Sequence, residues 1–134
     1  MKKTLFLISS FLFANFFIFA QTNISGGEVS GTWTKANSPY LIQGAIMIAN
    51  DSTLTIEPGV SVIFQGGYKF LVMGRLLAVG TVSDSITFTA ADTAIGWRGI
   101  RFDSTLATND TSKFFYCKFS YGKANGSDQD TKGG

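Results

Sequence analysis

Residues 54–64, LTIEPGVSVIF, place two short strand patterns on either side of a Pro58-Gly59 turn. Apolar and polar side chains alternate in each of them, which is the period of a β-strand with one buried face. Similar short strands, bounded by Gly, Asn-Asp or Ser-Asp turns, occur at residues 40–42, 46–48, 70–72, 76–78, 86–88, 100–102 and 115–119. No window of helical length after residue 20 has the apolar period of a helix. The sequence therefore predicts an all-β chain.

The spacing of these strands predicts a repeat. The group 46–48, 54–56 and 60–64 is followed by the group 70–72, 76–78 and 86–88, at offsets of 24, 22 and 26 residues. A period of this length is typical of solenoid folds. Three strands in each period predict triangular coils that stack at the strand spacing of ~4.8 Å. Phe64, Phe88 and Phe102 are expected to stack inside, and Thr55 and Thr87 to face solvent.

The order of the motifs also resembles a known family. These motifs are GAIMI (44–48), LTIEPGVSVIF (54–64), GRLLAVGT (74–81), ITFTAA (86–91) and GWRGIRF (96–102). They are similar to the opening coils of bacterial secreted, pectin-lyase-like β-helix proteins, and the match covers residues 31–122. The resemblance implies a right-handed, single-stranded parallel β-helix. It implies no one activity, because lyases, hydrolases and adhesin-like surface proteins share this scaffold.

The first 20 residues have the features of a signal peptide. Lys2 and Lys3 precede a nearly unbroken apolar run, which ends at the small residue Ala20. A membrane anchor is the competing interpretation, and it is weaker because the run is shorter than the about 20 residues that span a bilayer. We therefore expect an exported chain, secreted or at the cell surface, with no membrane span after cleavage.

The rest of the chain divides into three parts. Residues 21–39 are expected to form a linker and an N-terminal cap, in which Trp33 covers the first coil. Residues 40–122 are expected to form the coils, and the polar, Gly-rich residues 123–134 a loop or the start of a missing continuation. The absence of a capping pattern at this end predicts that the chain is truncated at its C-terminus.

Composition restricts the function. The 134 residues are 45% hydrophobic and 15% charged, which suits a chain with a packed core. Without Lys2 and Lys3, nine basic residues balance nine acidic ones, so no nucleic-acid partner is expected. The single cysteine, Cys117, cannot form an internal disulfide. It is expected to face inward with Phe115 and Phe119 as a small apolar residue.

No catalytic residue is predicted. The chain contains no His, which removes Ser-His and Cys-His arrangements. Its carboxylates fall in different turns, about one in each, whereas paired catalytic carboxylates lie roughly 5 to 10 Å apart. No cofactor or metal is expected. Whether the protein is an enzyme stays open, because coils beyond residue 134 could contain the active site of a polysaccharide lyase or glycoside hydrolase.

Trp97, Arg98 and Arg101 form the only local cluster suited to a sugar ligand. An aromatic face beside guanidinium groups can stack on a polar ring and donate hydrogen bonds to it. The alternative, which we favour, is structural: Trp97 fills a corner of the coil and Gly99 permits a tight bend.

Four Asp-(Ser/Thr) sequences resemble the acceptor motif of general O-glycosylation in one lineage of Gram-negative bacteria. The acceptors would be Ser52, Ser85, Thr93 and Ser104. Asp-Ser and Asp-Thr are also ordinary turn formers before a strand, and both interpretations stay open. Taken together, the sequence predicts an exported, non-catalytic module whose turns contact a carbohydrate or another cell-surface component.

Overall fold

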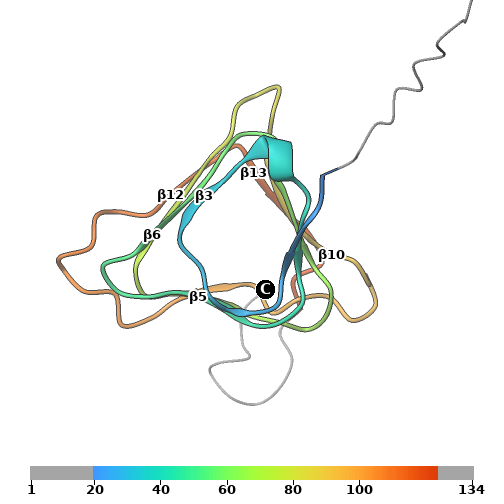
Figure 1. Cartoon of the computed structure of the whole chain (residues 1–134). Helices are drawn as coiled ribbons and strands as arrows, with labels where there is room; N and C mark the ends of the chain where they lie inside the picture. The colour runs from blue at the N-terminus through green and yellow to red at the C-terminus, as the bar shows by residue number, and fades with distance from the viewer. Residues whose placement is uncertain (1–19, 124–134) are drawn as a thin grey trace, which may run out of the picture.

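The computed structural model describes residues 20–123, which form a triangular solenoid of parallel strands (Figure 1). One face contains β1 (Thr22–Ile24), β4 (Tyr40–Ile42), β7 (Ser61–Phe64), β10 (Ile86–Ala90) and β13 (Cys117–Phe119). The second contains β2 (Gly27–Glu28), β5 (Ile46–Ile48), β8 (Phe70–Val72) and β11 (Ile100–Phe102). The third contains β3 (Gly31–Trp33), β6 (Thr53–Ile56), β9 (Arg75–Val79) and β12 (Lys113–Phe115). The fold is a right-handed parallel β-helix with three strands per coil.

The strand register confirms the repeat. Ile46 pairs with Phe70, Leu54 with Leu76, and Val62 with Phe88, which are the three offsets seen in the sequence. Side chains that alternate along each strand point in and out, so equivalent inward residues of successive coils form columns. The inward columns make up the core, in which Phe64, Phe70 and Phe88 have no exposed surface. Burial of these columns, and not local propensity, stabilises such short strands.

The first coil begins earlier than the sequence predicts. Part of the expected linker and cap, residues 22–33, forms β1, β2 and β3, each paired in parallel with the next coil. Trp33 is a core residue of this coil, 6% exposed and stacked on Tyr40 with ring centroids 4.6 Å apart. The stretch SGGEVSG conceals the strands because it has little apolar alternation, and Gly26, Gly27 and Gly31 take positive φ angles. The expected signal peptide falls on residues 1–20, of which 1–19 lie outside the described part.

Two details at the other end correct the predicted packing. Residues 115–119 are not one strand, because Tyr116 takes a φ of 48° and turns the chain from one face to the next. Phe114 therefore packs against the core, and Phe115 points outward with 55% exposure. Phe102 does continue the inward column of Val72, yet it is 47% exposed, since no strand among residues 20–123 covers it. The prediction that Phe102 is buried was therefore wrong.

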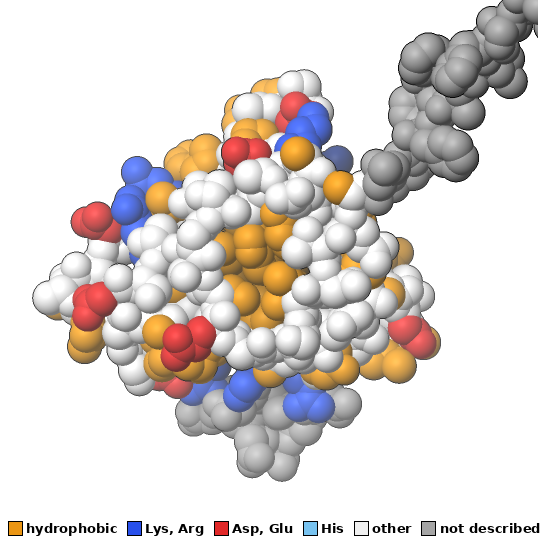
Figure 2. Space-filling view, in the orientation of Figure 1, with side chains coloured by type: hydrophobic (Ala, Val, Ile, Leu, Met, Phe, Trp, Pro, Cys, Tyr) orange, Lys and Arg blue, Asp and Glu red, His pale blue; other side chains and the backbone are white. Residues whose placement is uncertain are grey.

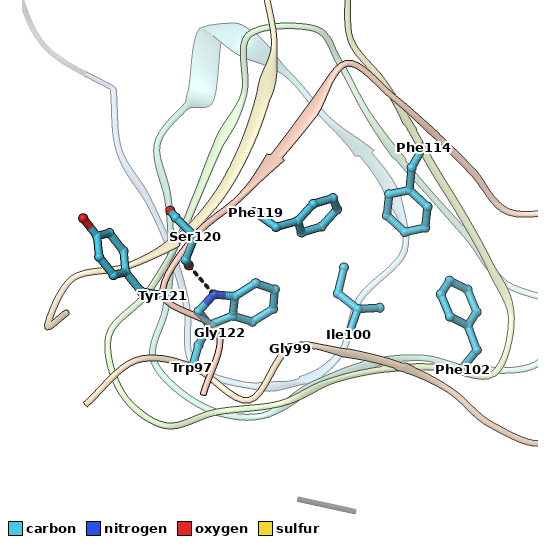
Figure 3. A pocket seen from close by; sticks show the side chains of 9 residues that line it. All are labelled: Trp97, Gly99, Ile100, Phe102, Phe114, Phe119, Ser120, Tyr121 and Gly122. Carbon is cyan, nitrogen blue, oxygen red and sulfur yellow. Dashed lines mark hydrogen bonds between the residues drawn. The ribbon is translucent and has the colours of Figure 1, made fainter. Parts of the chain in front are cut away.

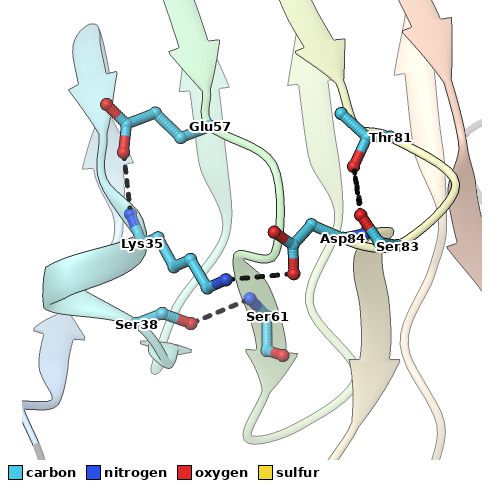
Figure 4. A network of polar contacts seen from close by, with 7 residues as sticks. All are labelled: Lys35, Ser38, Glu57, Ser61, Thr81, Ser83 and Asp84. Atoms are coloured by element: carbon cyan, nitrogen blue, oxygen red, sulfur yellow. Dashed lines mark hydrogen bonds and ion pairs between the residues drawn. The ribbon is translucent and has the colours of Figure 1, made fainter.

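A polar network joins three coils at one corner of the triangle (Figure 4). The short 3-10 helix η1 (Lys35–Asn37) lies here, and the Lys35 backbone N–H donates to Glu57. The Lys35 ammonium lies 3.0 Å from a carboxylate oxygen of Asp84, with both side chains about half exposed. Such an exposed ion pair contributes about 0–1 kcal/mol, so it aligns the turns more than it stabilises them.

Substitution of the stacked aromatics tests this packing. Phe88→Ala should cost about 3 to 5 kcal/mol, because it removes a fully buried ring that stacks on Phe119 with centroids 5.0 Å apart. Phe102→Ala should cost less than half as much, and the outward Thr87→Ala should stay within about ±0.5 kcal/mol. Urea unfolding at low protein concentration measures all three. Equal losses for the two phenylalanines would contradict the difference in burial between them.

Candidate functional site

The longest connection between two strands in residues 20–123 is the turn of residues 103–112, from β11 to β12. This turn reaches back along the outside of the solenoid to the turns of the two preceding coils, at residues 49–52 and 73–74. Those turns lie close together, and a Cβ on Gly74 would collide with backbone oxygens of Ala49 and Ser52. Glycine is therefore required at position 74. The stacked turns form a surface against which the longer turn packs.

Asn109 holds the long turn in place. Its side-chain carbonyl oxygen accepts the Asp51 N–H at 3.0 Å. Its amide group donates to Asn50 Oδ1 at 3.2 Å and to the Met73 carbonyl oxygen at 3.1 Å. One half-buried side chain thus connects three successive coils. Asp51 itself takes a φ of 62°, a left-handed conformation that Asp and Asn tolerate better than most residues.

A polar pocket of about 180 Å³ lies between this turn and the sheet. It is lined by Asp51, Thr53, Arg75, Thr108, Asn109 and Asp110. The Arg75 side chain borders the pocket. Its guanidinium group lies 3.3 Å from Asp110 Oδ2 and donates a hydrogen bond to the Thr111 carbonyl oxygen at 3.3 Å. Thr108 donates to Asp51 Oδ1 at 3.3 Å. We call this the Asp51–Asp110 pocket.

The chemistry of the pocket suits a neutral polyhydroxyl ligand. Two carboxylates and an amide oxygen accept hydrogen bonds, and a guanidinium and two threonine hydroxyls donate them. The formal charge of the lining is −1, because two aspartates face one arginine, and this disfavours an acidic ligand. Within residues 20–123 no three His, Cys, Asp or Glu side chains come close enough together to hold a metal ion.

The structure places Trp97 in the core, the half-buried Arg98 beside Gly67, and Arg101 on the outer face of β11. Trp97 is 2% exposed, stacks on Phe64 with centroids 4.3 Å apart, and donates its indole N–H to the Ser120 carbonyl oxygen at 2.8 Å. It fills a corner of the core, and Gly99 beside it has a φ of 75°. Arg101 lies on the outward column of β11 and pairs with Asp103 at 3.0 Å. The structural interpretation therefore describes Trp97 better than the sugar-binding one.

The four predicted glycosylation acceptors differ in accessibility. Thr93 and Ser104 are exposed in turns, whereas Ser52 and Ser85 are half-buried. Asp92 Oδ1 accepts the N–H groups of Ala94 and Ile95, at 2.8 and 3.1 Å. These contacts are those of an ordinary Asp turn, and modification of the four residues stays a prediction.

Cys117 packs against the edge of the core, as its position predicts, with Sγ 3.3 Å from the Ala78 carbonyl oxygen. Burial raises the pKa of the thiol above its ordinary value of 9.0, and a backbone hydrogen bond at Phe115 acts more weakly in the opposite direction. The thiolate is therefore disfavoured, so Cys117 lacks the lowered pKa of a reactive cysteine.

The Asp51–Asp110 pocket was not predicted from the sequence, although a signal was present. Residues 50–53 read Asn-Asp-Ser-Thr and residues 109–112 read Asn-Asp-Thr-Ser, so nearly the same turn sequence occurs twice. The two copies are far apart in the chain, and the coil brings them face to face. Nothing in the spacing alone predicts this contact, because the second copy lies in a turn that is longer than its counterparts in the two preceding coils.

Part of the chain is similar in sequence to a known protein. The chain is 39% identical over 61 residues to the protein bark beetle of Drosophila melanogaster, a match that covers 44% of this chain. The matched part is 2% of that relative's length. No family model and no solved structure matches the chain. No helix in residues 20–123 is long and apolar enough to cross a membrane.

Removal of the Asn109 side chain should loosen the long turn. Asn109→Ala leaves the Asp51 N–H and the Met73 carbonyl oxygen without this partner, and a hydrogen bond of this kind contributes about 0.5 to 1.5 kcal/mol. We expect faster proteolytic cleavage within residues 103–112, measured by limited proteolysis and mass spectrometry. Asn23→Ala, on an exposed strand position, is the control. Unchanged cleavage in Asn109→Ala would contradict the anchoring role.

Cys117 should react slowly with iodoacetamide in the folded protein and faster in urea at the same pH. Because the pKa is raised in the folded state, the unfolded thiol loses its proton first. Thiol ionisation therefore lowers stability as pH rises above about 9 and has no effect well below it. Alkylation rates of folded and unfolded protein at pH 8, with denaturation midpoints at pH 7 and 10, test both statements. Equal alkylation rates would show that Cys117 is not shielded.

Proposed function

We propose that this chain belongs to an exported, non-catalytic β-helix module that binds carbohydrate on its outer surface through the Asp51–Asp110 pocket. The observation that carries the proposal is the pocket itself: a polar hollow lined by both donors and acceptors, beside a turn that Asn109 anchors through its hydrogen bonds. Its volume of about 180 Å³ is on the scale of a single sugar ring. Binding sites on rigid scaffolds commonly lie in such turns.

Other features agree with an extracellular role. The basic and apolar start of the chain favours export, and a core packed without a disulfide is compatible with it. The resemblance of the motifs in residues 31–122 to pectin-lyase-like secreted proteins supports the proposal, because that kind of scaffold includes proteins that handle polysaccharides. The turns of the coils vary in length, as expected where they and not the strands provide specificity.

The two carboxylates of the pocket already have partners within the protein, which suits binding more than catalysis. Asp110 pairs with Arg75, and Asp51 accepts the Thr108 hydroxyl. A general acid needs a raised pKa and a general base a free, well-placed oxygen. The polysaccharide lyase or hydrolase scaffold therefore remains the alternative function, with an active site provided by other coils.

A glycan array of neutral and acidic oligosaccharides, probed with the purified protein, tests the proposal. We expect binding to neutral members, and Asp110→Asn should weaken it about tenfold, because the substitution removes a charged acceptor and releases Arg75. Asp84→Asn is the matched control, since it neutralises an aspartate in another surface ion pair, at a different corner of the triangle. Absence of glycan binding, or equal loss in both variants, would refute the proposal. Release of new sugar ends during incubation would show catalysis instead.

A further inference from the structure

The outer surface of the third face carries two exposed apolar side chains that lie next to each other. Viewed along its axis, the solenoid gathers hydrophobic side chains at the centre of the triangle (Figure 2). Val79 and Phe115 are instead 43% and 55% exposed, and they are paired neighbours on β9 and β12. They point outward because the residues before them, Ala78 and Phe114, point inward; Figure 3 shows Phe114 directed into the hollow at the end of the solenoid.

Packing of the solenoid does not explain this apolar patch. Coils stack on one another along the axis, whereas Val79 and Phe115 project from the side of β9 and β12. A further layer at either end would therefore leave both side chains on the surface. Neighbouring exposed apolar side chains on a soluble protein commonly mark a contact surface. The patch is thus a candidate for ligand contact.

The patch lies on the same strands as the Asp51–Asp110 pocket. Arg75 and Thr53, which line the pocket, pair with each other at the start of β9 and β6 and point outward. Val79 is the outward residue at the other end of β9, four positions beyond Arg75. At the strand rise of ~3.3 Å per residue these two positions are ~13 Å apart. The pocket and the patch are therefore the two ends of one straight path across the third face.

Leu77 and Lys113 lie in the middle of this path. They pair with each other across β9 and β12, and both point outward. In the two earlier coils the same outward column contains Thr55 and Thr32. The column thus changes from threonine to leucine and lysine on the two strands that carry the apolar patch. The alternation of the strands requires no such change, because all four positions face outward.

The sequence of side chains along the path suits an extended sugar chain. The pocket offers hydrogen-bond donors and acceptors at one end, and Phe115 offers an aromatic ring at the other. The faces of a β-linked hexose ring are apolar, since its hydroxyl groups lie around the edge, and such a face can pack on an aromatic side chain. Lys113 offsets the formal charge of −1 in the pocket lining, so the path favours a neutral chain.

We propose that the third face binds an extended, β-linked neutral glycan along the direction of its strands. The chain enters the Asp51–Asp110 pocket with one ring, passes over Leu77, and stacks a later ring on Phe115 beside Val79. This inference rests on the proposed function, because the pocket holds the first ring. It deepens that function by naming the ligand class: a linear chain of several rings, and not a single sugar.

Isothermal titration calorimetry with sugars of increasing length tests the path. The probes are glucose and mannose with their β-linked oligomers, the cello- and manno-oligosaccharides. In at least one series the affinity should rise at least roughly tenfold between the single sugar and oligomers that reach Phe115, the scale expected of an aromatic contact. Malto-oligosaccharides contain the same glucose in an α-linked, curved chain, so their affinity should not rise with length.

Variants along the path separate its two ends. Phe115→Ala should weaken binding of the long oligomers about tenfold and leave binding of the single sugar unchanged. Leu77→Thr, which restores the threonine of the earlier coils, should also weaken only the long oligomers, whereas Phe115→Tyr should bind them normally. Tyr121→Ala is the control, because it removes a similarly exposed aromatic side chain outside the path. Circular dichroism checks that every variant is folded.

The results that overturn this inference differ from those that refute the pocket. Binding of the single sugar that Asp110→Asn weakens, with no gain from added length, would overturn the path and keep the pocket. The same conclusion would follow if Phe115→Ala bound the long oligomers normally. An equal gain with length in the malto-oligosaccharides would overturn the extended ligand class. Absence of binding by every sugar would refute the pocket and the path together.

Discussion

The coverage of each inward side chain by the next coil is the constraint on which the whole structure depends. A coil of three short strands cannot bury its inner face by itself, so its apolar residues are covered only by the layers on either side. The column from Tyr40 through Val62 and Phe88 to Phe119 shows this directly. Where residues 20–123 provide no further layer, as beyond Phe119, the same residue type is half-exposed.

This constraint leaves the turns free to differ. The strands must keep register and inward apolar residues, whereas a turn outside the triangle can lengthen without disturbing any column. Residues 103–112 are such a turn. It folds back over the earlier turns because Asn109 finds backbone partners there, and the Asp51–Asp110 pocket is the result. A rigid repetitive core thus carries a site that is not itself repetitive, which is the usual division of roles in solenoid proteins.

The two ends of the solenoid present a different problem from its sides. Unpaired strand edges beside an apolar centre favour association with further strands, and many β-proteins block such edges with charges or loops. Here Lys113 and Glu28 lie at opposite ends with opposite charge. Exposed charges on such edge strands oppose unspecific pairing with further strands.

The sequence by itself determined the all-β class, the coil period and most of the core, because alternation and spacing are local properties. It determined the offsets of 24, 22 and 26 residues that the strand pairs show. Only the tertiary structure decided three other points. The Gly-rich residues 22–33 become strands because the next coil provides their hydrogen bonds, Phe114 replaces Phe115 inside because Tyr116 turns the chain, and two distant Asn-Asp turns meet because coils stack. Each of these depends on a contact between residues far apart in the chain, which no local pattern encodes.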